Sequence, residues 1–194
     1  VSVLFLATVC GRPVPANPAP GKDWVAAYTG PGHQFQHFMT GVLLVLAALS
    51  LMSFLTVLWT RISAARRPLS VSPLPLVAAG VAAACIAAGG VLMAVVSGST
   101  LFFSQPLPGT DVLRLANDLG FAMVSLGGML AAALSVACLS VQARSAGLFG
   151  RKLAVLGLVV AVLLLGALAF VPILGLLIWL VVASITLMRS RAGK

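Results

Sequence analysis

The sequence predicts an all-α fold, a polytopic bundle of transmembrane helices, from its composition, its apolar runs and the placement of its charges. Of the 194 residues, 61% are hydrophobic and 8% are charged, whereas a soluble domain carries about 25% charged residues. Several charge-free blocks reach the roughly 20 residues that cross a bilayer core of about 30 Å. We therefore expect one membrane domain over residues 1–194, with five complete spans and the outer end of a first helix.

The chain opens on the apolar stretch VSVLFLATVC, residues 1–10. As a helix this stretch would be about 15 Å long, which is too short to cross the bilayer. It also lacks the basic segment that begins a signal peptide. We interpret it as the partial first helix of an intact six-helix protein, whose earlier residues precede this sequence.

Residues 11–37 predict a proline-rich loop outside the cytoplasm, with an extended, polyproline-like path. Within this loop the stretch DWVAAY predicts one helical turn capped by Asp23, with Trp24 and Tyr28 four residues apart on one face. Aromatic residues in such a place are typical of the headgroup level of a membrane. We expect the pair to anchor the loop at the interface, and stacking on a ligand is the alternative.

The first three complete spans are the charge-free blocks at residues 38–60, 74–98 and 119–141. Arg61 ends the first of these blocks and Arg144 follows the third. Because each block is long enough to cross the hydrocarbon core and is bounded by charge, each predicts one transmembrane helix.

The last charge-free block covers residues 153–188 and is longer than one span requires. A single helix of that length would reach roughly 54 Å, well beyond the bilayer core. Pro172 lies inside the block and lacks the backbone N–H that a helix interior needs. We therefore predict two spans, residues 153–170 and 172–188, joined tightly near Val171.

This final hairpin would place most of the basic residues on one side of the membrane. They are Arg61, Arg66, Arg67, Arg144, Arg151, Lys152, Arg189, Arg191 and Lys194. The other side receives the three acids, Asp23, Asp111 and Asp118, with Arg12, Lys22 and Arg114. The positive-inside rule then places both termini in the cytoplasm of a multi-pass plasma-membrane protein. We read the net charge of +9 as a topology signal and expect no nucleic-acid partner.

Small residues recur at helical spacing in two of the predicted spans. Gly80, Ala84 and Ala88 share one face of the second complete span, and Gly128 and Ala132 share one face of the third. Lipid provides no hydrophobic drive for helices to associate, so close backbone approach and dispersion must hold the bundle together. We expect the two spans to be adjacent and central. Docking of a partner membrane subunit on these faces is the alternative.

The sequence contains no motif that indicates a reaction. The central parts of the spans hold no Asp, Glu, Lys, Arg or His, whereas pumps and ion-coupled transporters require such groups. Metalloprotease, nucleophile-elbow, phosphate-loop and dinucleotide motifs are all absent. Cys10, Cys85 and Cys138 lack metal-ligand spacing. These observations favour a protein without enzymatic activity.

The C-terminal third, from GLFGRKLAVLG to ITLMRSR, resembles the end of a group of actinobacterial integral membrane proteins of unknown function. Its members are similar in having six helices, aromatic residues in the first outer loop, and a final hairpin that ends in Trp, Ser and a basic tail. Trp179, Ser184 and Arg189 occupy these places, and the likeness covers residues 24–191. A Pro-x-Trp element before the fifth helix is replaced by Gly150-Arg151-Lys152. The resemblance implies an architecture and no activity.

The two histidines of the chain stand in the stretch GHQFQHF, just before the first complete span. If this stretch is helical, His33 and His37 lie one turn apart on one face. Asp118 precedes the third complete span on the same side of the membrane. Imidazole and carboxylate together suit zinc, copper or iron, so these three residues form a candidate metal or haem site. The alternative is polar packing at a membrane boundary, with Asp118 in the first turn of a helix.

The sequence thus predicts a non-enzymatic membrane protein, an accessory or structural subunit that packs against other membrane proteins. Two alternatives remain open. One is a metal- or haem-binding protein that uses His33 and His37 at the outer face. The other is a binder or carrier of a small lipophile between the helices, which the scarcity of charge permits.

Overall fold

The computed structural model describes residues 20–65, 72–166 and 171–192. Within these ranges every regular element is a helix, so the all-α prediction is confirmed. The elements are α2 (Gly21–Tyr28), α3 (Pro31–Ala65), α4 (Leu74–Phe103), α5 (Thr110–Ala122), the π-helix η2 (Met123–Gly128), α6 (Met129–Ser145), α7 (Arg151–Leu165) and α8 (Val171–Ala192). Residues 1–10, predicted as part of a first helix, lie outside the described ranges.

Among the described residues, three helices are long and apolar enough to cross a membrane. They cover Gly32–Ala65, Leu74–Phe103 and Thr110–Ser145, and the last of them joins α5, η2 and α6 in one continuous rod. The final apolar block is divided into α7 and α8, and the described part of α8 contains a shorter apolar helix, Leu174–Thr186. The membrane class is therefore supported, while the count of six spans and the cytoplasmic position of the termini stay predictions.

The long helices extend beyond the charge-free blocks, because hydropathy marks only the part of a helix that suits hydrocarbon. Their ends are set by backbone geometry instead. α3 starts at Pro31, directly after Gly30, whose φ of +93° is readily adopted only by glycine. α4 continues to Phe103 and stops at Ser104, which takes a left-handed conformation with φ 52°.

This extension corrects the expectation for Asp118. α5 begins at Thr110, well before the charge-free block, so Asp118 lies within a helix rather than in its first turn. The acid in the first turn is Asp111. Sequence hydropathy misses this start because α5 is amphipathic, with polar side chains on one face.

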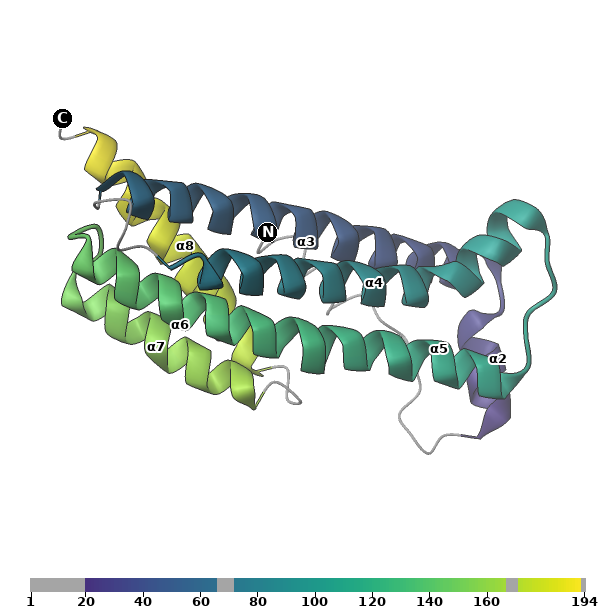
Figure 1. The fold of residues 1–194 in the computed structure, drawn as a ribbon. Coiled ribbons are helices and arrows are strands. Elements are labelled where there is room, and N and C mark those ends of the chain that lie inside the picture. The colour runs from purple at the N-terminus through teal and green to yellow at the C-terminus, as the bar shows by residue number, and fades with distance from the viewer. Residues whose placement is uncertain (1–19, 66–71, 167–170, 193–194) are drawn as a thin grey trace.

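Figure 1 shows α3, α4 and the α5–η2–α6 rod running side by side, with α4 in the middle. α7 packs along α6, and α8 crosses the bundle obliquely next to α7. The prediction that the second and third complete spans are adjacent and central is therefore confirmed. α2 lies across the end of the bundle where α3 and α5 begin, and we call this the capped end.

Glycine lets the backbones of the central helices touch. A Cβ atom on Gly90 of α4 would lie 2.8 Å from the carbonyl oxygen of Gly41 in α3 and 2.9 Å from Cβ of Leu44. On the other side of α4, a Cβ atom on Gly120 would lie 3.0 Å from the carbonyl oxygen of Gly89. α4 is thus clamped between α3 and α5 by backbone contact on both sides, the packing that small residues permit in membranes.

The π-helix lies where the rod faces α4. Within this turn Ser125 donates a hydrogen bond of 2.6 Å to the carbonyl oxygen of Phe121. Two glycines in η2 then contact α4 closely: Gly127 lies against Cys85, and Gly128 lies against Ile86. The sequence did not predict this irregularity.

The small-residue faces separate into buried and outward-facing ones. Gly128 and Ala132 are buried within the chain, so they serve internal packing and are not available to a partner. A Cβ atom on Gly80 would meet no other atom within 4 Å, and Ala84 is exposed. Of the two predicted small-residue faces, only the one on α4 with Gly80, Ala84 and Ala88 is therefore available for docking a partner.

Trp179 is enclosed by side chains from neighbouring segments. The ring is fully buried, with Phe54 and Phe149 edge-on to it at 6.5 Å and 6.4 Å between ring centroids. Its Nε1 would lie 2.7 Å from a Cβ atom on Gly157, which also contacts Oγ of Ser140. Neither polar atom has a hydrogen-bond partner among the described residues. Only glycine fits at position 157.

Charge is separated between the two ends of the bundle. All three acids of the chain belong to α2 and α5 at the capped end. Arg61 is near the end of α3, Arg144 is near the end of α6, and Arg151 and Lys152 begin α7. These helix ends lie opposite the capped end (Figure 1), and we call them the basic end. There the carbonyl oxygen of Ser72 accepts hydrogen bonds from Trp59 and Gln142, which ties α3, α4 and α6 together. The charge separation predicted from sequence is present in the described residues.

We predict that Gly90→Ala destabilises the bundle, because its methyl group would press on the backbone of α3. Overpacking of this kind costs about 1–3 kcal/mol, measured as a lower midpoint of thermal unfolding in detergent. Gly80→Ala is the matched control on the same helix and should leave the midpoint unchanged or raise it, since alanine favours helix. Equal stability of the two variants would contradict the backbone contact between Gly41 and Gly90.

Candidate functional site

The aromatic residues of α2 form part of a small core at the capped end. Trp24 and Tyr28 share one face of the helix, as predicted, and pack on Val96 of α4 and Leu113 of α5. Their exposed fractions are only 1% and 4%. The expectation that they anchor the chain in the headgroup region is therefore wrong, because their face is turned inward onto the bundle.

His37 holds α2 against α3. The imidazole is buried and stacks on the ring of Tyr28, with the centroids 4.4 Å apart and the planes 8° from parallel. Its Nε2 lies 3.2 Å from the carbonyl oxygen of Ala27. A carbonyl can only accept, so Nε2 is the protonated nitrogen and donates this bond. His37 thus has a structural role in fastening α2.

The structure places the other predicted metal ligands in different surroundings. His33 is exposed, although it stands one turn before His37 on the same helix, and Asp118 is exposed on α5. Asn117 is buried beside Asp118 and donates a hydrogen bond of 3.3 Å to its carboxylate. Among the described residues, no three His, Cys, Asp or Glu side chains gather into a group that suits a metal ion. The predicted triad is not assembled, and metal or haem ligation by His33 and His37 stays a prediction.

Arg114 completes the cap from α5. Its guanidinium lies 5.9 Å from the centroid of the Trp24 ring, within the range of a cation–π contact. The sequence missed this contact because the two residues are far apart in the chain, and only the tertiary packing of α2 on α5 brings them together. Trp24, Tyr28, His37 and Leu113 thus form a buried junction between α2, α3 and α5.

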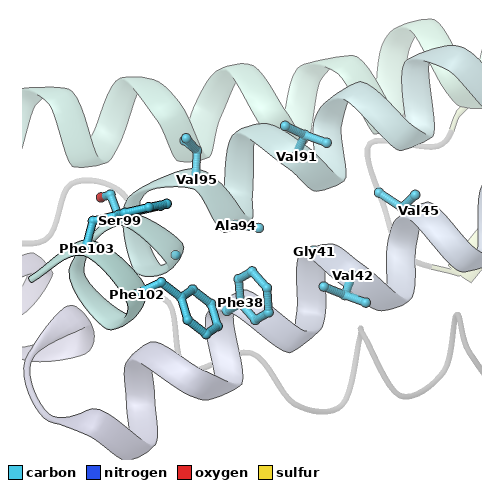
Figure 2. Close-up of a pocket in the computed structure, with 11 residues that line it drawn as sticks. Phe38, Gly41, Val42, Val45, Val91, Ala94, Val95, Ser99, Phe102 and Phe103 are labelled. Atoms are coloured by element: carbon cyan, nitrogen blue, oxygen red, sulfur yellow. The ribbon is translucent and has the colours of Figure 1, made fainter.

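An apolar groove of about 380 Å³ lies between α3 and α4 near the capped end. Figure 2 shows side chains from both helices around it, with the rings of Phe38 and Phe102 at one end. These two rings meet edge to face at 5.1 Å between centroids. The lining is completed by Gly41, Val42, Val45, Val91, Ala94, Val95, Gly98, Ser99 and Phe103.

Glycine and alanine let the two helices touch beside the groove. A Cβ atom on Gly41 would lie 2.5 Å from Cβ of Ala94, and the side chains of valine and phenylalanine surround the groove (Figure 2). Ser99 adds a hydroxyl, but this group donates to the carbonyl oxygen of Val96 at 2.8 Å. The available surface is therefore apolar, and it suits hydrocarbon or apolar side chains.

The groove, which α3 and α4 form together, continues into a longer exposed surface of α4. We call this surface the outer side of α4, and none of the described elements covers it. Its members are Val77, Gly80, Val81, Ala84, Ala88, Val91, Val95 and Phe102. The half toward the basic end carries the small residues, and the half toward the capped end carries the groove. The two halves form a continuous strip along the helix.

Comparison with known proteins adds no relative to this description. A scan against protein-family models, a search of curated proteins and a search of solved structures each found no match.

We predict that His37→Ala releases α2 from the bundle, while His33→Ala does not. The change at His37 removes the ring stack and a hydrogen bond, together worth about 2 kcal/mol. Amide hydrogen exchange in residues 21–28 should accelerate by roughly 30-fold, since local opening follows this free energy. His33 is exposed and supplies the control. Equal exchange in the two variants would show that His37 does not fasten α2.

Proposed function

We propose that this chain is a non-enzymatic, multi-pass plasma-membrane protein, an accessory subunit that packs against a helix of another membrane protein. The observation that supports this proposal best is the uncovered outer side of α4, which combines small residues and a groove along one helix. The actinobacterial resemblance of the sequence would fit six helices with both termini in the cytoplasm, and we propose this topology as well.

The small-residue half suits close approach of a second helix. A partner backbone can come near α4 at Gly80 and Ala84, because neither position places a large side chain in the way. Helices in lipid associate through such contacts, since apolar area alone brings no advantage over lipid tails. Small size and outward exposure at the same positions therefore favour docking rather than internal packing.

The groove half suits the larger side chains of the same partner helix. Val91 and Val95 stand at its rim and remain more than half exposed, at 57% and 53%. Apolar side chains inserted between these rims would gain dispersion contacts that disordered lipid tails fill less well. A partner helix with small residues at one end and bulky apolar residues at the other would complement this surface.

Purification in mild detergent tests the proposal. We expect a stoichiometric membrane partner to copurify with the wild-type chain, and Ala84→Trp to abolish this by filling the small-residue half. Leu130→Trp is the matched control, because Leu130 is also exposed to lipid but lies on α6. A well-behaved lone monomer from native membranes, or equal partner recovery with both variants, would contradict the proposal.

The groove also favours a second candidate function, the binding of a small lipophile. Its volume of about 380 Å³ is within the range of small-molecule sites, and its lining is apolar as such sites require. Phe38 and Phe102 offer flat surfaces for a ring or an acyl chain.

Mass spectrometry of extracted lipids tests this second function. We expect one compound to be enriched over the bulk membrane lipids in the wild-type sample and to be lost in Val95→Trp, which fills the groove. Val81→Trp lies on the same side of α4 outside the groove and should retain the compound. Finding only bulk lipids in the wild type would remove this candidate.

A further inference from the structure

We propose that the basic end of the bundle binds the headgroups of anionic phospholipids. The surface consists of Arg144 at the end of α6, Arg151 and Lys152 at the start of α7, and Arg61 near the end of α3. This inference rests on the membrane placement in the proposed function but goes beyond it, because it concerns neither α4 nor a protein partner.

The basic side chains at this end form no ion pairs with acidic side chains among the described residues. Arg144, Arg151 and Lys152 are exposed, Arg61 is half-buried, and none of them forms an ion pair with another described residue. The chain has only three acidic side chains, and all of them belong to α2 and α5 at the capped end. The positive field of the basic end is therefore not neutralised by side-chain carboxylates of this chain, and it calls for an external anion.

The turn between α6 and α7 is a fixed support for three of these cations. Gly147 adopts φ +74°, and the amides of Leu148 and Phe149 donate hydrogen bonds of 2.9 Å and 3.2 Å to the carbonyl oxygen of Ala143. Phe149 is then buried edge-on against Trp179. Because the backbone is fixed in this way, Arg144, Arg151 and Lys152 are presented together without a large loss of backbone entropy on binding.

Position along the helices identifies the anion as a lipid headgroup. Arg144 lies in the last turn of a helix that is long and apolar enough to span a membrane, so its guanidinium stands near the boundary of the hydrocarbon. Lipid phosphates lie at this level, and guanidinium groups bind phosphate through paired hydrogen bonds. Basic residues beside a membrane segment are attracted to anionic lipid in proportion to their number.

The test is native mass spectrometry of the full chain released from nanodiscs that contain equal amounts of phosphatidylglycerol and phosphatidylcholine. We expect phosphatidylglycerol to be retained preferentially by the wild type. The triple variant Arg144→Gln, Arg151→Gln, Lys152→Gln should lose this preference by roughly 100-fold, at about fivefold for each charge removed. Lys22→Gln removes an exposed cation at the capped end, and this control variant should retain the preference for phosphatidylglycerol.

Two further arms make the outcome decisive. Inorganic phosphate at millimolar concentration should not displace the lipid if the headgroup is held at the membrane surface, and displacement would overturn the lipid assignment in favour of a free phosphate site. If the triple variant fails to fold, the wild type alone still decides the question. Its preference for phosphatidylglycerol must weaken as salt is raised, and equal retention of both lipids at low salt would overturn the proposal.

Discussion

The structure depends on the contact of backbone with backbone on both sides of α4. In water the hydrophobic effect would press these helices together, but lipid offers no such force, and only close packing distinguishes a neighbouring helix from lipid tails. Gly41 meets Gly90 on one side, and Gly89 meets Gly120 on the other. These contacts place α4 between α3 and the rod, and none of the described elements covers its remaining side. The groove borders the same contact, since Gly41 and Ala94 belong to its lining.

The two ends of the bundle are built on different principles. At the capped end, α2 folds its aromatic face inward, and His37 and Arg114 complete an inner junction of rings and a cation. At the basic end the turn between α6 and α7 buries Phe149 and leaves its cations outward. One end therefore encloses His37 and the ring of Trp24 within the chain, and the other presents its cations to the surroundings. A membrane with an anionic cytoplasmic leaflet would fix the orientation of such a molecule.

The outer side of α4 and the basic end give the chain two surfaces of different chemistry. One is apolar and lies along the membrane-spanning part, where it fits a helix or a lipophile. The other is cationic, and we propose that it binds lipid phosphate. Together with the burial of Trp24, Tyr28 and His37 inside the capped end, these two surfaces are the features on which the proposed accessory role rests.

The sequence by itself determined the helical class, the long apolar spans, the break in the last block and the separation of charge, because each follows from local composition and spacing. The adjacency of α4 and α6 was also predicted from small residues at helical spacing, although Gly80 and Ala84 of the predicted α4 face are turned outward. The tertiary structure decided the rest. Trp24 and His37 could equally have faced lipid, solvent or a ligand, and only the docking of α2 made them a core. Gly80 and Gly128 carry the same sequence signal, yet one faces outward and one is buried, because helix rotation within a bundle is set by all neighbours together. The groove could not be predicted from the sequence for the same reason, since residues of both α3 and α4 form it.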